Sequence, residues 1–158
     1  MKTRLFLVAL LLSSLVGFEV PHPTTIPDGA YGVFQIEDMD VPLFTSIGSD
    51  QATVDLEDCA LIRKWGNGLL IADHAGSKHG DEEWRVNEWT VGTTAFIITP
   101  TETRAYHLVA VLWGQYGATT YTFDGSPVYP HRNDLMCVSC GRDNSVFIAI
   151  LEYEGVIP

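Results

Sequence analysis

Short apolar stretches alternate with turn-forming residues along most of the chain. Several of these stretches are rich in β-branched and aromatic residues, which strands favour, and Asn-Gly, Asp-Gly and Thr-Pro pairs separate them. The last stretch begins with six consecutive apolar residues, as is typical of a strand covered on both faces. The pattern predicts one mainly β domain, a closed barrel. The stretches are residues 31–36, 68–72, 94–99, 105–113, 119–123, 135–140 and 146–153.

One stretch has helical rather than alternating spacing. Positions 56, 59, 60 and 62 are apolar and follow Asp55 at the intervals of one helix face. Asp55 suits an N-cap, and Arg63 and Lys64 suit the last turn before Gly66. We therefore expect a short helix from Asp55 to about Lys64, on the flank of the barrel.

The N-terminus is typical of a targeting segment. Lys2 and Arg4 precede an uncharged, mostly apolar stretch of fourteen residues, shorter than the roughly 20 residues of a spanning helix and suited to a signal peptide. No clear cleavage site follows, so residues 1–18 are expected to be a signal peptide or an N-terminal membrane anchor. Both place the rest of the chain outside the cytoplasm. Residues 19–29, rich in proline, are the expected tether, and residues 30–158 the barrel domain.

The chain is strongly acidic. Without Lys2 and Arg4, nine basic residues become seven, against twenty acidic residues, a net charge of −13. Such a chain repels phosphate backbones, which excludes nucleic acid as a partner. The charge itself needs no explanation beyond solubility.

The three cysteines suggest the first candidate for chemistry. An odd number in an oxidising compartment leaves one thiol free or pairs it between chains. Cys140 ends an apolar strand and precedes Gly141, so it is held by the sheet yet open to solvent. Cys137 and Cys140 form a Cys-x-x-Cys, but side chains alternate along a strand and these two point to opposite faces. Cys137 is therefore a core residue or pairs with Cys59, and no zinc site is expected.

His74 is the candidate proton-transfer partner. It follows the apolar strand 68–72 at the point where the chain enters a polar loop. A histidine at a strand end in the same fold as a strand-end cysteine is a candidate general acid and base. Among the other histidines, His131 near the cysteine strand is the rival.

Three motifs in this order resemble those of sortases. Residues 135–140, Leu-Met-Cys-Val-Ser-Cys, resemble the strand that reads apolar, Thr, apolar, apolar, Thr and then the catalytic Cys. Residues 68–74, Gly-Leu-Leu-Ile-Ala-Asp-His, are similar to the strand that ends in Gly-His or Asp-His. Residues 89–98 resemble the segment with Gly-Asp before a strand, with Thr93 where the family often has Asp. The resemblance spans roughly residues 31–153.

The resemblance implies an eight-stranded barrel and a cysteine transpeptidase. Such an enzyme cleaves a sorting motif near the C-terminus of secreted proteins, forms a thioacyl enzyme and passes the acyl group to an amine, on a cell-wall precursor or a pilin lysine. In this chain the resemblance implies that Cys140 is the nucleophile and that His74 transfers the protons. The resemblance implies no cofactor and no metal.

Sortases also place an arginine shortly after the cysteine, near the start of the last strand. Here that strand contains no arginine, and Arg142, in the turn after Cys140, is the candidate for this role. Arg104 and Arg132 are the alternatives. Two other functions are alternatives: a non-catalytic secreted barrel that keeps a disulfide and binds a peptide or glycan, and a chymotrypsin-like cysteine hydrolase. The latter needs two barrels, for which the chain is too short.

Overall fold

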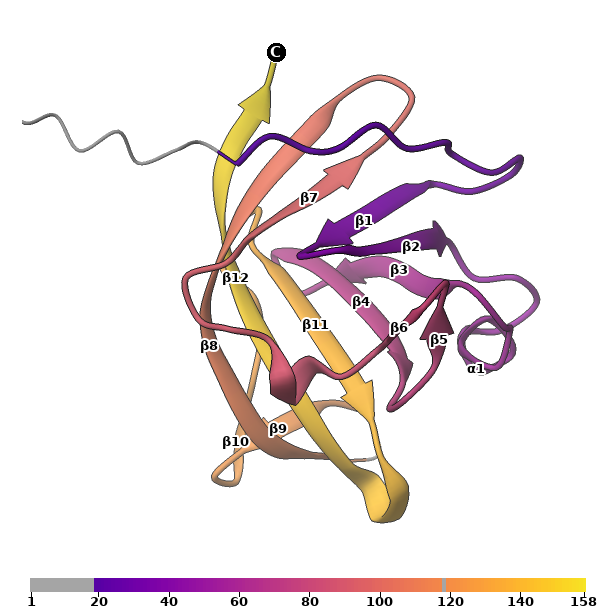
Figure 1. Cartoon of the computed structure of the whole chain (residues 1–158). Helices are drawn as coiled ribbons and strands as arrows, with labels where there is room; N and C mark the ends of the chain where they lie inside the picture. Colours follow the sequence, from indigo (N-terminus) through magenta and orange to yellow (C-terminus); the bar gives the residue numbers. More distant parts are fainter. Residues whose placement is uncertain (1–18, 118) are drawn as a thin grey trace, which may run out of the picture.

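The computed structural model describes residues 19–117 and 119–158 (Figure 1). The expected targeting segment at residues 1–18 lies outside the described residues. The described part is mainly β, as the sequence predicts, with one short α-helix and two single-turn 3-10 helices, η1 and η2. The elements are β1 (Gly32–Ile36), β2 (Met39–Phe44), α1 (Asp50–Val54), β3 (Ala60–Trp65), β4 (Gly68–His74), β5 (Lys78–His79), β6 (Glu82–Glu83), η1 (Val86–Glu88), β7 (Thr94–Ile98), β8 (Thr103–Tyr116), β9 (Tyr121–Phe123), β10 (Ser126–Pro127), β11 (Leu135–Cys140), η2 (Arg142–Asn144) and β12 (Ser145–Ile157).

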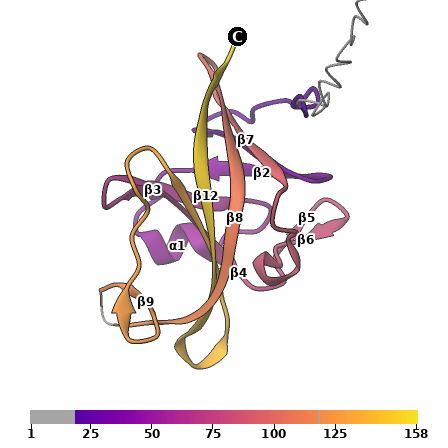
Figure 2. The same ribbon diagram turned by 90° about the vertical axis from the view of Figure 1, so that its left-hand side faces the viewer.

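Eight strands close into a barrel in the order β8, β12, β11, β4, β3, β2, β1, β7, and β7 pairs back with β8. The neighbours β4 and β11 are parallel, as are β2 and β3, and the other pairs of the barrel are antiparallel. The longest pairing joins β8 and β12, which run side by side in Figure 2. The short strands β9 and β10 extend the sheet beyond β8. The expected closed barrel is confirmed.

Two apolar clusters lie on the two faces of the sheet. The inner cluster takes alternate residues from all eight strands and fills the barrel, together with Trp84, Val86 and Trp89 from the chain between β6 and β7. The outer cluster lies on β3, β4, β11 and β12 and packs against Val54 of α1 and Tyr121 of β9. The central strands are therefore covered on both faces, which explains their uninterrupted apolar runs.

The expected helix from Asp55 to about Lys64 is wrong. The helix of this region is α1, which begins earlier, with Ser49 as its N-cap; the Ser49 hydroxyl accepts a hydrogen bond from the Ala52 amide at 3.1 Å. Asp55 is the C-cap instead, and residues 60–65 form β3, antiparallel to β4. Leu61 packs in the outer cluster and Ile62 in the inner one, so consecutive apolar residues face opposite sides of a sheet.

The glycines taken as the end of that helix form a hairpin turn. Trp65 pairs with Gly68 across a two-residue loop, and Gly66 in this loop has φ +56°. Tight hairpin turns favour such left-handed residues, which glycine adopts without steric cost. A short apolar run before a glycine fits either the end of a helix or a strand. Here the pairing with β4 makes it a strand.

Residues 19–29, the expected tether, are mostly exposed but are hydrogen-bonded to the barrel. The Gln35 side chain of β1 donates a hydrogen bond to the His22 carbonyl oxygen at 3.0 Å, and Thr24 donates to Asp40 of β2 at 2.7 Å. These hydrogen bonds hold residues 19–29 as an extended strap that crosses one end of the barrel (Figure 1). No helix among the described residues is long and apolar enough to cross a membrane.

Candidate functional site

Cys140 and His74 are the last residues of neighbouring parallel strands. Cys140 ends β11, His74 ends β4, and the two are direct register partners. The carboxyl ends of parallel strands meet at one edge of a sheet, and both strands end together at the lower end of the barrel in Figure 1. The structure therefore brings the two predicted residues together on adjacent strand ends.

Both side chains belong to the outer face of the barrel. Cys140 packs against the outer cluster, which contains Met136 and Val138 at the preceding alternate positions of β11. His74 is the register partner of Cys140 on the neighbouring strand, so its side chain lies on the same face. Cys137 lies in the inner cluster, so the two thiols of the Cys-x-x-Cys point to opposite faces, as predicted.

The Cys140 thiol is partly buried, and its surroundings act on it in opposite directions. Burial raises the pKa of the thiol above its ordinary value, a hydrogen bond from the Tyr121 hydroxyl lowers it, and the negative charge of Asp73 raises it further. The net pKa is raised, so near neutral pH the resting group is a thiol and needs a base to become a nucleophile.

The His74 ring is oriented by Asp55. Its Nε2 lies 2.8 Å from Asp55 Oδ1, and this contact is the main cause that lowers the pKa of Asp55. A carboxylate accepts hydrogen bonds, so we assign the Nε2–H tautomer to the neutral ring. The Nδ1 atom is then the basic nitrogen that can exchange a proton. The His74 side chain is 45% exposed, which leaves room for a substrate beside it.

The other two cysteines are buried, as expected of a core residue at position 137. Cys59 is 5% exposed and Cys137 is fully buried. Burial raises the pKa of both thiols, and the charge of Asp73 adds to the effect at Cys59. All three cysteines lie in the described part of the chain and are free thiols, so no disulfide joins Cys59 to Cys137.

Thiol alkylation distinguishes the three cysteines. We expect iodoacetamide to modify Cys140 first in the folded protein, whereas Cys59 and Cys137 react only after unfolding. Because thiolate is the reactive form and the pKa of Cys140 is raised, its rate should keep rising at pH values above the ordinary midpoint of a free thiol. Peptide mapping by mass spectrometry reads each site separately. Equal protection of Cys140 and Cys137 would contradict this placement.

The rival residues lie elsewhere. His131 precedes β11, at the end opposite to Cys140, and its side chain is 92% exposed. Arg132 follows it there, about 20 Å from the thiol at the usual rise per strand residue. Arg104 on β8 is an ion-pair partner of Glu102 and lies opposite Val156, far along β12 from the residue that pairs with Cys140.

Arg142 lies in the turn that follows the cysteine strand. It begins η2, and the next two residues, Asp143 and Asn144, have φ of 60° and 59°. These left-handed residues reverse the chain into β12. Arg142 follows Cys140 by two residues, and its catalytic role stays a prediction.

The structure adds residues that sequence reasoning missed. Asp55, the C-cap of α1, contacts His74, and Tyr121 of β9 contacts Cys140. Asp73, next to His74, is fully buried against His79. Contacts of this kind depend on how distant segments pack; the one local signal was Asp73 itself, a charged residue inside an apolar strand.

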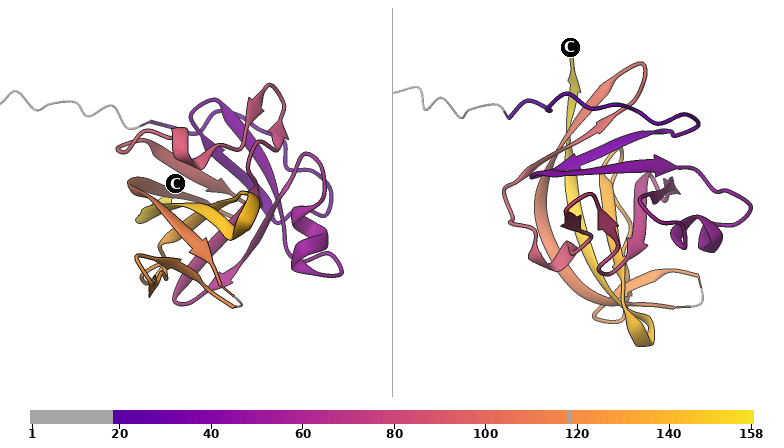
Figure 3. Two further views of the ribbon diagram at one scale, coloured as in Figure 1. Left: turned by 90° about the horizontal axis from the view of Figure 1, so that it is seen from below. Right: turned by 45° about the vertical axis from the view of Figure 1, so that its right-hand side comes forward.

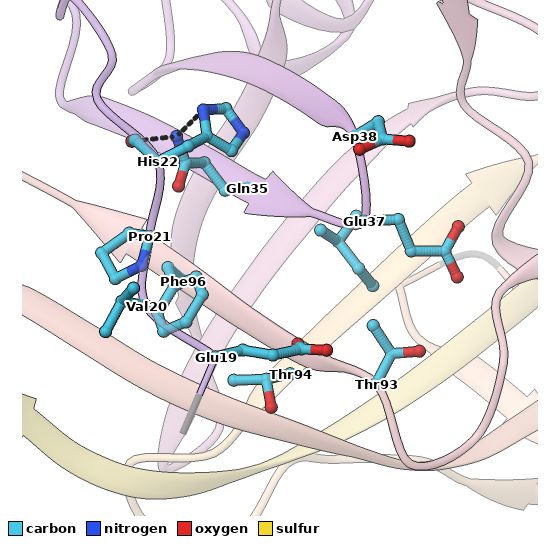
Figure 4. Close-up of a pocket in the computed structure, with 11 residues that line it drawn as sticks. Glu19, Val20, Pro21, His22, Gln35, Glu37, Asp38, Thr93, Thr94 and Phe96 are labelled. Atoms are coloured by element: carbon cyan, nitrogen blue, oxygen red, sulfur yellow. Dashed lines mark hydrogen bonds between the residues drawn. The ribbon is translucent and has the colours of Figure 1, made fainter. Parts of the chain in front are cut away.

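A cavity of about 340 Å³ lies away from these residues (Figure 4). It sits between the strap at residues 19–22, the β1–β2 turn and the start of β7, and the figure shows Glu19, Glu37 and Asp38 around it. Neither Cys140 nor His74 lines it. This cavity is therefore separate from the candidate site.

No family model and no curated protein matches the sequence, whereas the fold matches solved structures. Sortase C of Streptococcus pneumoniae aligns with a TM-score of 0.60 at 12% identity, over 84% of this chain and 70% of that chain. Sortase C-3 of the same species gives 0.61 at 15% identity, over 89% and 70%. Sortase A of Listeria monocytogenes gives 0.58 at 14% identity, over 82% and 90%. At such identities the likeness shows the fold: this chain has a sortase-like barrel.

Proposed function

We propose that this chain is an extracytoplasmic cysteine transpeptidase of the sortase type, with Cys140 as nucleophile and His74 as proton-transfer group. The observation that carries the proposal is the register of β4 and β11, which sets these two residues side by side on one face of a sortase-like barrel. The partial exposure of both residues supports it, because a polypeptide substrate has to reach them.

The first half of the reaction cleaves an amide bond. His74 accepts the thiol proton, and the Cys140 sulfur attacks the scissile carbonyl carbon to form a tetrahedral oxyanion. The intermediate collapses with cleavage of the C–N bond, and His74 gives the proton to the leaving amine. The acyl group is then held as a thioester on Cys140.

The second half makes a new amide. An incoming amine attacks the thioester carbonyl, loses a proton to His74 and expels the Cys140 sulfur, which regains the proton. A thioester conserves acyl energy and is readily attacked by amines, so transfer competes with hydrolysis when the acceptor amine is well positioned.

The proposed partners follow from this chemistry. The donor is a peptide sorting motif of a secreted protein, and the acceptor is an amine, on a cell-wall precursor or a pilin lysine. Partners of this kind meet the enzyme outside the cytoplasm, and residues 1–18 are the proposed signal peptide or membrane anchor. The alternative of a disulfide-stabilised binding barrel has less support, because the cysteines are free.

A transfer assay tests the proposal. The folded protein is incubated with a peptide library and hydroxylamine, a small and strongly nucleophilic amine, and products are identified by mass spectrometry. We expect hydroxamates formed at one internal peptide bond of a subset of library members. A folded protein that leaves the library intact at every amine concentration would contradict the activity.

Arg142 is proposed to stabilise the oxyanion. Donors aimed at such an oxygen commonly supply a few kcal/mol, and a guanidinium offers several. We expect Arg142→Ala to lower transfer by at least about a hundredfold, about 2.7 kcal/mol, without loss of folding. Arg132→Ala, at the far end of β11, is the matched control and should keep its activity. Unchanged kinetics of Arg142→Ala on a working substrate would remove Arg142 from the mechanism.

A further inference from the structure

Asp73 is a fully buried carboxylate directly before His74. Its Oδ1 accepts hydrogen bonds from the His74 backbone amide at 2.6 Å and from the Ser77 hydroxyl at 2.9 Å. Its Oδ2 lies 2.8 Å from Nε2 of His79, and the side chains of Asp73 and His79 are both 0% exposed. Three groups from β4, the following loop and β5 therefore converge on one carboxylate beneath the site.

The same loop ties the ends of β4 and β11 together. The Ala75 amide donates to the Cys140 carbonyl oxygen at 3.0 Å, and the Trp84 indole donates to the Val138 carbonyl oxygen at 2.9 Å. The Trp84 amide in turn donates to the Ser77 carbonyl oxygen at 2.7 Å. In Figure 3, right, the β5–β6 hairpin lies at the end of the barrel where these strands finish. Asp73 thus anchors a loop that contacts both residues of the proposed pair.

His79 serves Asp73 as a hydrogen-bond donor. Its Nδ1 has no hydrogen-bond partner among the described residues, and its ring packs edge-on against Trp84. A buried lone pair left unpaired costs less than a buried charged ring with an unpaired N–H, so we assign a neutral His79 with the proton on Nε2. Asp73 is then the negative charge of the buried pair.

The buried Asp73–His79 pair is not expected to stabilise the fold. Burial of a carboxylate costs several kcal/mol, and buried ionic pairs are often replaced by apolar residues without loss of folding. Its hydrogen bonds, however, fix one geometry of the chain around it. We propose that Asp73, held by His79 and Ser77, is the positioning residue that fixes His74 beside Cys140. This inference rests on the proposed function.

The charge of Asp73 has a second consequence. Its titratable contact is His79 on β5, and across the sheet its charge raises the pKa of the Cys140 and Cys59 thiols. The same charge opposes formation of the Cys140 thiolate, so its removal should lower the pH at which the thiol loses its proton.

The substitution Asp73→Asn removes the negative charge of the side chain and keeps its shape. The amide keeps an oxygen for the His74 amide and Ser77, but it removes the negative charge and places an N–H against Nε2 of His79. We expect kcat for transfer to fall about 10- to 100-fold with little change in KM. We also expect the pH midpoint of Cys140 alkylation to move to lower pH, a change that a purely structural residue would not cause. Lys78→Gln, exposed beside His79, is the control and should change neither quantity.

A pair of substitutions at His79 tests the hydrogen bond separately. Glutamine can present its amide N–H to Asp73 in place of Nε2, whereas leucine cannot. His79→Gln should keep most of the activity, and His79→Leu should lose kcat as Asp73→Asn does. If folded Asp73→Asn shows an unchanged kcat and alkylation midpoint, or if the two His79 variants behave alike, the positioning role is wrong.

The pH midpoint of Cys140 alkylation can be measured without any peptide transfer. If wild-type protein transfers no peptide and Asp73→Asn still shifts the midpoint, then the proposed function fails while the coupling of Asp73 to the site holds. If Asp73→Asn does not fold, His79→Gln and His79→Leu test the positioning role instead. The pH midpoint of Cys140 alkylation is then compared between these two variants.

Discussion

Cys140→Ala is expected to reduce peptide transfer to the background rate, a loss of at least about 10⁴-fold. The thiol forms the covalent bond that conserves acyl energy, and no other group on the strand end can replace it. Thermal unfolding should change little, because the side chain is small and partly exposed. The measurement is the initial rate of hydroxamate formation with purified protein.

Cys59→Ala is the matched control for this prediction. Cys59 is buried beside α1, where its sulfur lies 4.0 Å from the Thr53 carbonyl oxygen. Its loss should lower stability modestly and leave the transfer rate of the folded protein intact. Equal loss of transfer in both variants, or full activity of Cys140→Ala, would contradict the assignment of the nucleophile.

His74→Ala is expected to lower kcat for transfer by about 10²- to 10⁴-fold, the usual contribution of general acid–base catalysis. Both half-reactions need a proton acceptor and donor beside the sulfur, and the Asp55 contact orients the ring for it. Because His74 is 45% exposed, its removal opens a space that added imidazole can enter. We therefore expect partial recovery of activity with imidazole, measured in the same assay.

His131→Ala is the control histidine. It lies at the far end of β11, almost fully exposed, and its substitution should change neither the rate nor the imidazole dependence. If His74→Ala retained the wild-type rate while His131→Ala lost it, the proton-transfer role would belong to the rival residue.

The strands that position the site were accessible from sequence. Residues 135–140 form β11 as expected, and the strand expected at 68–72 continues to His74 in β4. Both are covered on two faces, so their apolar runs are long and end in a polar residue or a glycine. That both strands end at one edge was less accessible, because their parallel pairing joins residues about 66 positions apart.

The features that the sequence did not predict all depend on contacts between distant segments. Residues 60–65 form β3 because they pair with β4 and are covered by both clusters, which local spacing cannot reveal. The strand β2 was not predicted either, because Asp40 and Pro42 within it are typical of a loop. The Asp73–His79 contact depends on the path of the loop between β4 and β5, for which no local rule exists.

The most direct test of the central claim is an acid-quenched mass measurement of the Cys140 peptide after incubation with the peptide library. The account predicts an acyl adduct on Cys140 that hydroxylamine discharges and that accumulates when no amine is present. The adduct should be absent in Cys140→Ala and form more slowly in His74→Ala. Peptide cleavage or transfer by the folded protein with Cys140 unmodified at every time point would contradict the account.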